Sequence, residues 1–260
     1  MIYLRNKDLL KEIKKSKDSY SSYSTKEDAD YDIIVNDISD ITPQVIEDGK
    51  EARAIRLAKL AHEEACNTIK PKPKLGDFQI DPSTINRTDI VFRVMTYSHI
   101  PKEPGRVNKP KREADHHAKV PFPPYKHYRF TEEGKLVCVG KSHWKGDLEE
   151  GKFDPESGMT TRLLAEMYMK LCQRYASRGN WRNYSYNDEM QGQAIIQLVQ
   201  VGLQFDESKS ENPFSYYTSV ITNSFTKILN NEKKQQNIRD DILEMNDKTP
   251  SYTRQNQTSE

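Results

Sequence analysis

Cysteine is scarce in this sequence, and long apolar runs are missing. Cys66, Cys138 and Cys172 are odd in number and widely separated along the 260 residues. This usage favours reduced thiols over a disulfide framework. No apolar stretch approaches the roughly 20 residues that cross a bilayer, and the N-terminus shows no basic region followed by an apolar one. We therefore expect a soluble, cytoplasmic protein without a membrane partner.

An excess of charge of one sign is also missing. Forty lysines and arginines balance thirty-nine aspartates and glutamates, and the formal net charge is +1. Such a chain has no global basic character that would attract nucleic acid, so any nucleic-acid surface must be local. With 35% hydrophobic and 30% charged residues, we expect a modest core and long solvated segments.

Recognisable catalytic motifs are absent as well. The sequence has no glycine-rich phosphate loop, no HExxH and no GxSxG, and its carboxylates are scattered among lysines. A zinc site can be written from His116, His117, Cys138 and His143, but their spacing does not follow the paired pattern of structural zinc sites. A metal-dependent enzyme therefore stays an alternative, and we predict a protein that is not an enzyme and needs no cofactor.

The N-terminal part predicts two helices joined by a linker. Asn6 is a suitable N-cap for a short amphipathic helix. Residues 16–40 have the polar composition of a solvated linker. Thr42 and Pro43 form a helix start signal, and helix-favouring residues follow to about Lys70, where prolines end the pattern.

A small insert that contains β-structure is expected next, over residues 75–144. Residues 89–97 are β-branched and aromatic, as in a strand, and residues 128–139 resemble a β-hairpin. Between them, residues 101–129 combine prolines with an excess of basic residues, which favours an extended segment.

The expected domains follow these patterns. They are an N-terminal helix and linker (1–40), a long helix with the proline-rich, hairpin-containing insert (41–158), a helical domain (159–245) and a disordered tail (246–260).

Two helices of the third domain carry the most informative surfaces. The first spans 187–203, with a core stripe that includes Met190, Ala194 and Leu198. Glutamines recur on another face, and two interpretations stay open for them: a solvated surface, or an uncharged hydrogen-bonding face for a protein partner. These glutamines are Gln193, Gln197, Gln200 and Gln204.

The second helix starts at Asn212-Pro213. Its expected core stripe is Phe214, Tyr217, Ile221, Phe225 and Ile228. Another side groups Tyr216, Asn223, Lys227, Asn230 and Lys234. An aromatic, amide and lysine surface suits single-stranded DNA, because a base can stack on a ring while lysines follow the phosphates. The alternative is that Tyr216 only completes the edge of the core.

These residues carry a resemblance to a known family. The sequence resembles the late-transcription sigma factors of T-even-type tailed phages and, more distantly, region 2 of bacterial housekeeping sigma factors. The match covers about residues 159–243 and the first helix, about two fifths of the chain. The residues that carry it are Tyr3, Asn6–Leu10, Phe205–Lys209 (FDESK), Asn212-Pro213, Tyr216, Thr218, Asn223, Phe225, Glu232 and Lys234.

The resemblance implies a fold class and two binding faces. The fold would be mainly α: a helical sigma region 2-like bundle with a small β-containing insert and extended linkers. The face toward core RNA polymerase would comprise Glu189, Gln193, Gln197, Gln200 and Gln204. The face toward AT-rich, minus-ten-like promoter DNA would comprise Tyr216, Tyr217, Asn223, Lys227, Asn230, Lys233, Lys234, Gln236 and Arg239.

The sequence departs from the family at identifiable positions. Val220 and Ile221 stand where the wider family has the aromatic pair that captures a base. The residues after Ile242 are too few for the helix-turn-helix that reads the minus-thirty-five element. The phage factors join the replication sliding clamp through a hydrophobic-acidic C-terminal motif, which residues 251–257 do not resemble, so a sliding clamp or co-activator stays an open partner.

We therefore expect a phage-type sigma factor that acts in the cytoplasm of an infected host cell. It would direct host core RNA polymerase to minus-ten-like late promoters and assist their opening. The alternative is a polymerase-binding adaptor or inhibitor without DNA recognition. For the insert, we hypothesise that its proline-rich basic segment contacts upstream DNA or another polymerase surface.

Overall fold

The chain forms two compact units in the computed structural model, which describes residues 4–68, 73–103 and 116–257. Unit 1 comprises Met1–Leu10, Arg162–Gly202 and Glu211–Glu260. Unit 2 comprises Lys11–Thr161 and Leu203–Ser210. Tyr3, Lys70 and residues 104–115 of the proline-rich segment lie outside the described residues.

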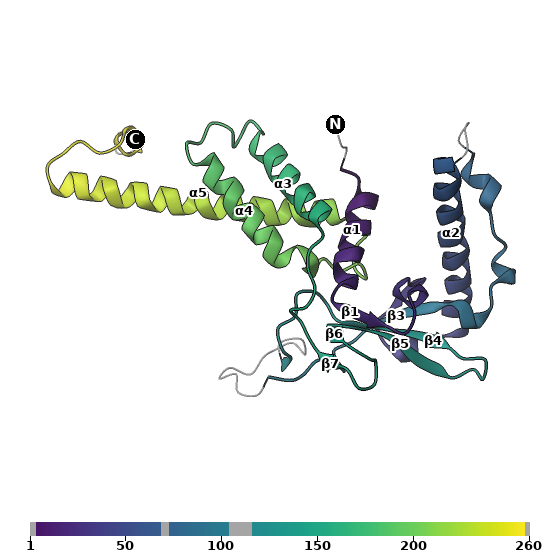
Figure 1. Cartoon of the computed structure of the whole chain (residues 1–260). Coiled ribbons are helices and arrows are strands. Elements are labelled where there is room, and N and C mark those ends of the chain that lie inside the picture. The colour runs from purple at the N-terminus through teal and green to yellow at the C-terminus, as the bar shows by residue number, and fades with distance from the viewer. Residues whose placement is uncertain (1–3, 69–72, 104–115, 258–260) are drawn as a thin grey trace. The chain divides into compact units, whose positions relative to one another are not determined.

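Unit 1 is a bundle of helices, and its longest helix, α5, runs beyond α3 and α4 (Figure 1). Within the described ranges, no helix is both long and apolar enough to cross a membrane. The helices of unit 1 are α3 (Arg162–Ala176), α4 (Asn187–Val201), α5 (Pro213–Met245) and α6 (Tyr252–Gln257). The short 3-10 turn Gly202–Gln204 follows α4, and the start of α1 (Asn6–Asp18) also belongs to this unit.

The core of unit 1 confirms the predicted helical periodicity. Side chains at steps of three and four on α3, α4 and α5 are buried together, and Asn212 caps α5 by accepting a hydrogen bond from the Ser215 amide at 3.1 Å. Phe214 is the exception in its expected stripe, at 39% exposure. The core includes Leu164, Tyr168, Leu171, Met190, Ala194, Leu198, Tyr217, Ile221 and Phe225.

Unit 2 is built on a five-stranded mixed sheet with the strand order β1-β5-β4-β3-β2. Only the β2–β3 pair is parallel among its neighbours. The strands are β1 (Ser21–Tyr23), β2 (Ile33–Val35), β3 (Val91–Met95), β4 (Tyr125–Phe130) and β5 (Leu136–Ser142), and β6 (Trp144–Lys145) pairs with β7 (Lys152–Phe153). Helix α2 (Pro43–Thr68) also belongs to unit 2, as do 3-10 turns at Glu27–Ala29, Ile38–Asp40, Leu75–Phe78, Pro82–Thr84 and Arg87–Asp89.

One face of the sheet has an apolar part, around Phe92, Phe130 and Leu136, that packs against α2. Phe92 of β3 and Phe130 of β4 meet edge to face at 5.8 Å between ring centroids, and Ala54 of α2 is buried in the same cluster. Gly49 allows the close approach, because a Cβ at this position would lie 3.0 Å from Ile90. This part of the face is therefore an ordinary hydrophobic core.

The opposite face buries a cation. Arg93 is 1% exposed, and its guanidinium lies 3.7 Å and 3.8 Å from the ring centroids of Tyr31 and Tyr125. Its Nε donates to His127 Nε2 at 2.9 Å, and His127 Nδ1 donates to the Asp28 carbonyl at 2.6 Å. Burial and the neighbouring guanidinium hold the pKa of His127 well below its usual value. Aromatic rings and a neutral histidine thus take the place of a carboxylate partner.

A second buried cation, Lys17, ties the chain between α4 and α5 into unit 2. Lys17 Nζ donates to the Phe205 carbonyl at 2.7 Å and to a Glu207 carboxylate oxygen at 2.6 Å. The side chains of Lys17 and Glu207 are only 2% and 13% exposed. This explains why residues 203–210 belong to unit 2, although they connect two helices of unit 1.

The expected fold class was wrong. The molecule is an α/β protein with a five-stranded sheet, not a mainly α protein with a small insert. Residues 16–40, predicted to be a solvated linker, supply β1 and β2. These strands are three residues long, too short for an alternating pattern, and β1 pairs with β5, about 120 residues away. The two units therefore do not follow the expected domain borders.

The C-terminal residues also differ from the expected disordered tail. Residues 252–257 form α6, and Arg254 pairs with Asp241 at 2.8 Å and with Glu244 at 3.2 Å. The Ser251 amide donates to Asp240 at 2.8 Å. As far as Gln257, the tail therefore folds back on α5.

The Lys17 pair yields a stability prediction. We expect Lys17→Met to lower the free energy of unfolding of unit 2 by about 3 kcal/mol, because Glu207 would stay buried without a counter-charge. Urea unfolding measured in a Trp181→Phe background leaves Trp144 of unit 2 as the single tryptophan reporter.

The matched control is Lys135→Met, whose pair with Glu133 is 78% and 74% exposed. Its loss should stay below about 1 kcal/mol. Equal losses for the two variants would show that Lys17 is not a structural anchor.

Candidate nucleic-acid interface

The predicted polymerase face of α4 forms one surface, and it contains an apolar residue that the sequence analysis missed. Glu189 and Gln200 are exposed, and Gln193 and Gln197 are half-buried. Ile196 is 52% exposed and, at 100° per residue, lies within about 40° of both Glu189 and Gln200. Its spacing of seven and four residues from them was the available signal.

Gln204 stands apart from this surface. Helix α4 ends at Val201, and Gln204 is exposed in the 3-10 turn Gly202–Gln204. The predicted helix to residue 203 was therefore slightly too long. The continuous α4 face comprises Glu189, Gln193, Ile196, Gln197 and Gln200.

Tyr217, predicted to contact DNA, is instead a core residue. It is 0% exposed, and its hydroxyl donates to the Gly202 carbonyl at 3.2 Å and accepts from the Tyr168 hydroxyl at 3.3 Å. Its ring packs edge to face on Tyr168 at 5.0 Å. A ring enclosed in this way cannot stack on a base, which corrects the prediction.

Tyr216 is half-buried, and its polar end is engaged at the end of α4. Its hydroxyl donates to the Val201 carbonyl at 2.9 Å. Burial raises the pKa of this phenol. Tyr216 and Tyr217 thus satisfy consecutive carbonyls at the C-terminus of α4, where the helix itself offers no donors.

Helix α5 separates the remaining predicted DNA residues into two groups. Lys233 is exposed but is turned about 80° from the main stripe at 100° per residue. Gln236 and Arg239 lie about 140–160° away from the stripe, and Gln236 donates to the Ser251 hydroxyl at 3.1 Å. The stripe itself is Tyr216, Asn223, Lys227, Asn230 and Lys234, and its last four members are exposed.

A hollow of about 260 Å³ brings members of both predicted faces together. Gln197 of α4 meets Asn223 and Lys227 of α5 there, and Val220 lines the same hollow. The buried Ser224 hydroxyl has no hydrogen-bond partner among the described atoms. The remaining lining residue is Val201. The two predicted faces therefore adjoin, and their border is a small mixed polar and apolar pocket.

The FDESK segment has a structural role of its own. Asp206 accepts from the Ser208 amide at 3.0 Å and pairs with Lys209 at 2.8 Å. Burial opposes ionisation, but the hydrogen bonds from Lys209 and Ser208 hold the pKa of Asp206 below its usual value. Together with the Glu207–Lys17 pair, these contacts fix the turn within unit 2.

The histidines of unit 2 do not assemble the zinc site considered from the sequence. Within the described part of the chain, no group of three or more potential ligands could hold a metal ion. His143 is fully buried, and its ring packs at a tilt against Phe122 with 4.0 Å between the ring centroids, whereas His116 is exposed. His117 is buried against Tyr97 at 5.2 Å.

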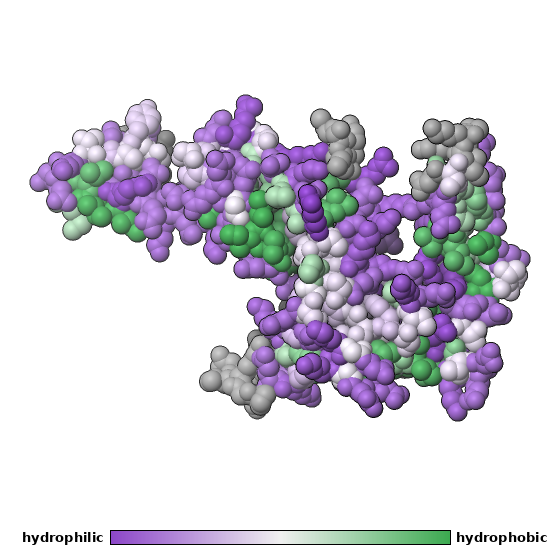
Figure 2. Space-filling model, in the orientation of Figure 1, coloured by the Kyte–Doolittle hydropathy of each residue, from purple (hydrophilic) through white to green (hydrophobic). Residues whose placement is uncertain are grey.

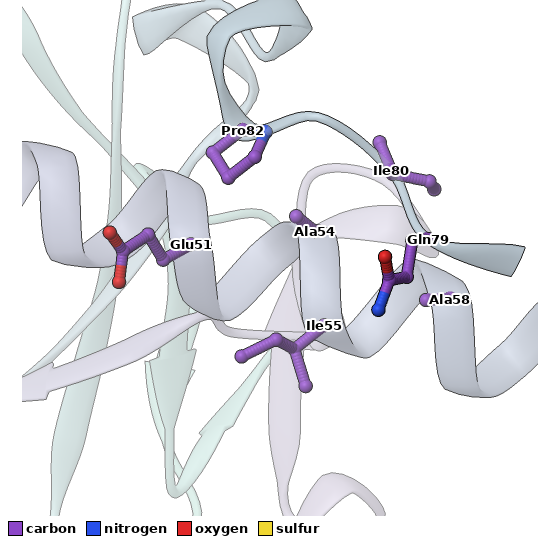
Figure 3. Close-up of a pocket in the computed structure, with 7 residues that line it drawn as sticks. All are labelled: Glu51, Ala54, Ile55, Ala58, Gln79, Ile80 and Pro82. Carbon is purple, nitrogen blue, oxygen red and sulfur yellow. The ribbon is translucent and has the colours of Figure 1, made fainter. Parts of the chain in front are cut away.

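A shallower hollow on unit 2 offers little chemistry. Figure 3 shows Ala54 and Ala58 of α2 across from the segment around Gln79 and Pro82, around a space of about 320 Å³. Glu51 is the one carboxylate among its lining residues, which also include Ile55 and Ile80. It is a mainly apolar recess, and the small side chains of Ala54 and Ala58 line its α2 side.

Comparisons with known proteins add no assignment. No family model matched the chain, and neither a curated protein nor a solved structure matched it. The residues and contacts of the two units therefore carry the functional interpretation.

Two histidines that are largely removed from water, His99 and His143, predict a pH dependence. Burial lowers the pKa of His99 to about 4 and that of His143 to about 3, below the usual unfolded value near 6.5. Their contribution to stability is complete above about pH 6.5 and is lost as the pH falls toward these values. Each histidine then lowers the free energy of unfolding by up to about 1.4 kcal/mol per pH unit.

Urea unfolding at pH 7.5 and pH 5.5, followed through Trp144 in the Trp181→Phe background, measures this loss. His99→Asn should reduce the pH dependence, and the control His116→Asn, at an exposed position, should leave it unchanged. The same pH dependence in all three proteins would contradict the assignment.

Proposed function

We propose that this protein is a sigma-type transcription initiation factor. In this proposal, α4 binds core RNA polymerase, and α5 engages minus-ten-like promoter DNA. The resemblance to phage late-transcription sigma factors makes the host enzyme the expected polymerase and late promoters the expected targets.

The observation that supports the proposal most directly is the α4 face. An exposed isoleucine within a stripe of amides is unusual for a solvated surface, because Ile196 leaves apolar area in water. A protein partner would cover that area, and the amides of Gln193 and Gln200 could bind partner groups without the desolvation cost of charges.

The α5 stripe supports a DNA contact. Lys227 and Lys234 are exposed on the same side of the helix, with Asn223 and Asn230 between and beside them. Lysines at this spacing can follow a phosphate backbone, and amides can bind base edges. With Tyr217 buried, Tyr216 is the one aromatic residue left on this stripe.

The hollow between α4 and α5 is the proposed site for an unstacked base. Val220 replaces a family aromatic residue there, so a base would rest on an aliphatic wall instead of a ring. The polar groups available to it are those of Gln197, Asn223 and Ser224. Extruding a base costs a few kcal/mol, which favours capture only where the polymerase helps to open the duplex.

Weak DNA binding by the free protein is also expected. If about four phosphates are contacted, a fourfold rise in salt weakens binding roughly a hundredfold. Polymerase binding would compensate by raising the effective concentration of promoter DNA at α5.

Ile196 provides the test of the polymerase face. Ile196→Glu should weaken binding to core RNA polymerase about tenfold or more, because an ionised carboxylate would replace the exposed apolar contact of the face. Fluorescence anisotropy of labelled protein titrated with core polymerase measures this. Leu163→Glu, at a 40% exposed position on α3, is the matched control and should bind like the wild type. Similar affinities for both variants would refute the α4 face.

Lys227 and Lys234 test the DNA face and separate the two candidate functions. We expect Lys227→Gln/Lys234→Gln to keep polymerase binding but to lower transcript yield from a minus-ten promoter about tenfold, through the loss of two phosphate contacts. Lys248→Gln is an exposed control. If the wild-type protein binds polymerase but never initiates at the promoter, the adaptor or inhibitor function replaces the sigma function.

A further inference from the structure

Two lysines face each other on adjacent strands of unit 2. Lys126 of β4 lies directly opposite Lys141 of β5 in the antiparallel register. Like charges in this position destabilise a sheet. Lys126 forms no ion pair within the ranges that the structure describes, and Lys141 donates to the Leu148 carbonyl. Among the described residues, neither lysine therefore has a carboxylate partner that would relieve the repulsion between the two ammonium groups.

The surroundings of the lysines combine aromatic rings with hydrogen-bond donors. Tyr128 and Cys138 form the next pair on the same face of the sheet, and Lys141 Nζ lies 4.5 Å from the Trp144 ring centroid. All of these side chains are partly exposed. Burial lowers the pKa of Lys126, and the charge of Lys141 lowers it further, although the Cys138 thiol opposes the shift. The two cations are therefore close enough to interact.

Helix α2 does not cover this part of the sheet face. Its core contacts are with Phe92, Phe130 and Leu136, at the other end of the same strands. His99 lies close to the two lysines. Its Nε2 donates to the Ser142 carbonyl at 3.0 Å, and its buried Nδ1 has no hydrogen-bond partner among the described atoms. Both lysines also contribute to the lowered pKa of His99. This end of the face is thus positively charged and only partly covered.

We propose that Lys126, Tyr128, Lys141 and Trp144 form a lysine–aromatic face that binds single-stranded DNA. A phosphate between Lys126 and Lys141 would relieve their repulsion, and the rings of Tyr128 and Trp144 would pack against bases. A single strand fits better than a duplex, because only unpaired bases present their faces to such rings. The proposal does not depend on α5, since all four residues belong to unit 2.

The test uses the full chain, without polymerase, in the Lys227→Gln/Lys234→Gln background, so that the α5 stripe contributes less. Anisotropy of a fluorescein-labelled 20-nucleotide oligo-dT strand is measured between 50 and 200 mM NaCl. Lys126→Gln/Lys141→Gln should weaken binding about tenfold at 50 mM and reduce the salt slope by about 0.7, the value for one phosphate of a single strand. Tyr128→Leu should weaken binding about fivefold and leave the salt slope unchanged.

The control is Lys59→Gln/Lys135→Gln, which removes the same charge from exposed positions of unit 2 and should bind like its parent. Crosslinking of a bromodeoxyuridine strand to the parent should label a peptide that contains Tyr128 or Trp144, a readout that needs no lysine variant to fold. Equal binding by the two lysine variants, or crosslinks elsewhere, would overturn the proposal. So would competition by poly-glutamate as effective as that by unlabelled oligo-dT of equal charge, which would instead indicate an acidic protein partner.

Discussion

The structure of unit 2 depends on a lysine ammonium group that is almost completely removed from water. Lys17 reaches from α1 to the chain between α4 and α5 and finds both a carboxylate and a backbone carbonyl there. A buried ammonium without such partners would cost several kcal/mol. The requirement for a partner therefore determines where residues 203–210 lie, and it gives the FDESK segment a structural role in addition to any role in binding.

The two faces of the sheet in unit 2 bury their side chains through different kinds of contact. On the α2 face, Phe92 and Phe130 give the non-directional stabilisation of apolar contact. On the other face, Arg93 is held by rings and by a histidine whose tautomer is fixed by its two hydrogen bonds. Gly140 is part of this arrangement, because a Cβ there would lie 2.5 Å from the Tyr23 ring. Directional contacts of this kind specify one strand register more strictly than apolar packing does.

Local signals predicted much of the secondary structure but not the fold class. Strong helical periodicity located α3, α4 and α5, and the hairpin turn was recognisable from Gly134, which has φ +78°. The three-residue strands β1 and β2 carry no comparable signal, since their positions depend on distant strands. The sheet therefore could not be assembled from local patterns alone.

The candidate site shows the same limit. Spacing alone grouped Tyr217 with the core residues Ile221 and Phe225, and that grouping is confirmed, whereas the family resemblance had moved Tyr217 to the DNA face. Ile196 was overlooked because an isoleucine in a helix is first assigned to a core. The α4–α5 hollow depends on how two helices pack, which periodicity does not determine.

The discontinuity of unit 2 also sets an order for its folding during synthesis. Ribosomes add about 5–20 residues per second, so residues 11–161 emerge seconds before residues 203–210. Until then, the Lys17 ammonium has neither Glu207 nor the Phe205 carbonyl and keeps its hydration shell. The place that residues 203–210 take beside Lys17 must stay open to water at that stage, and it can close only when α3 and α4 have already left the ribosome.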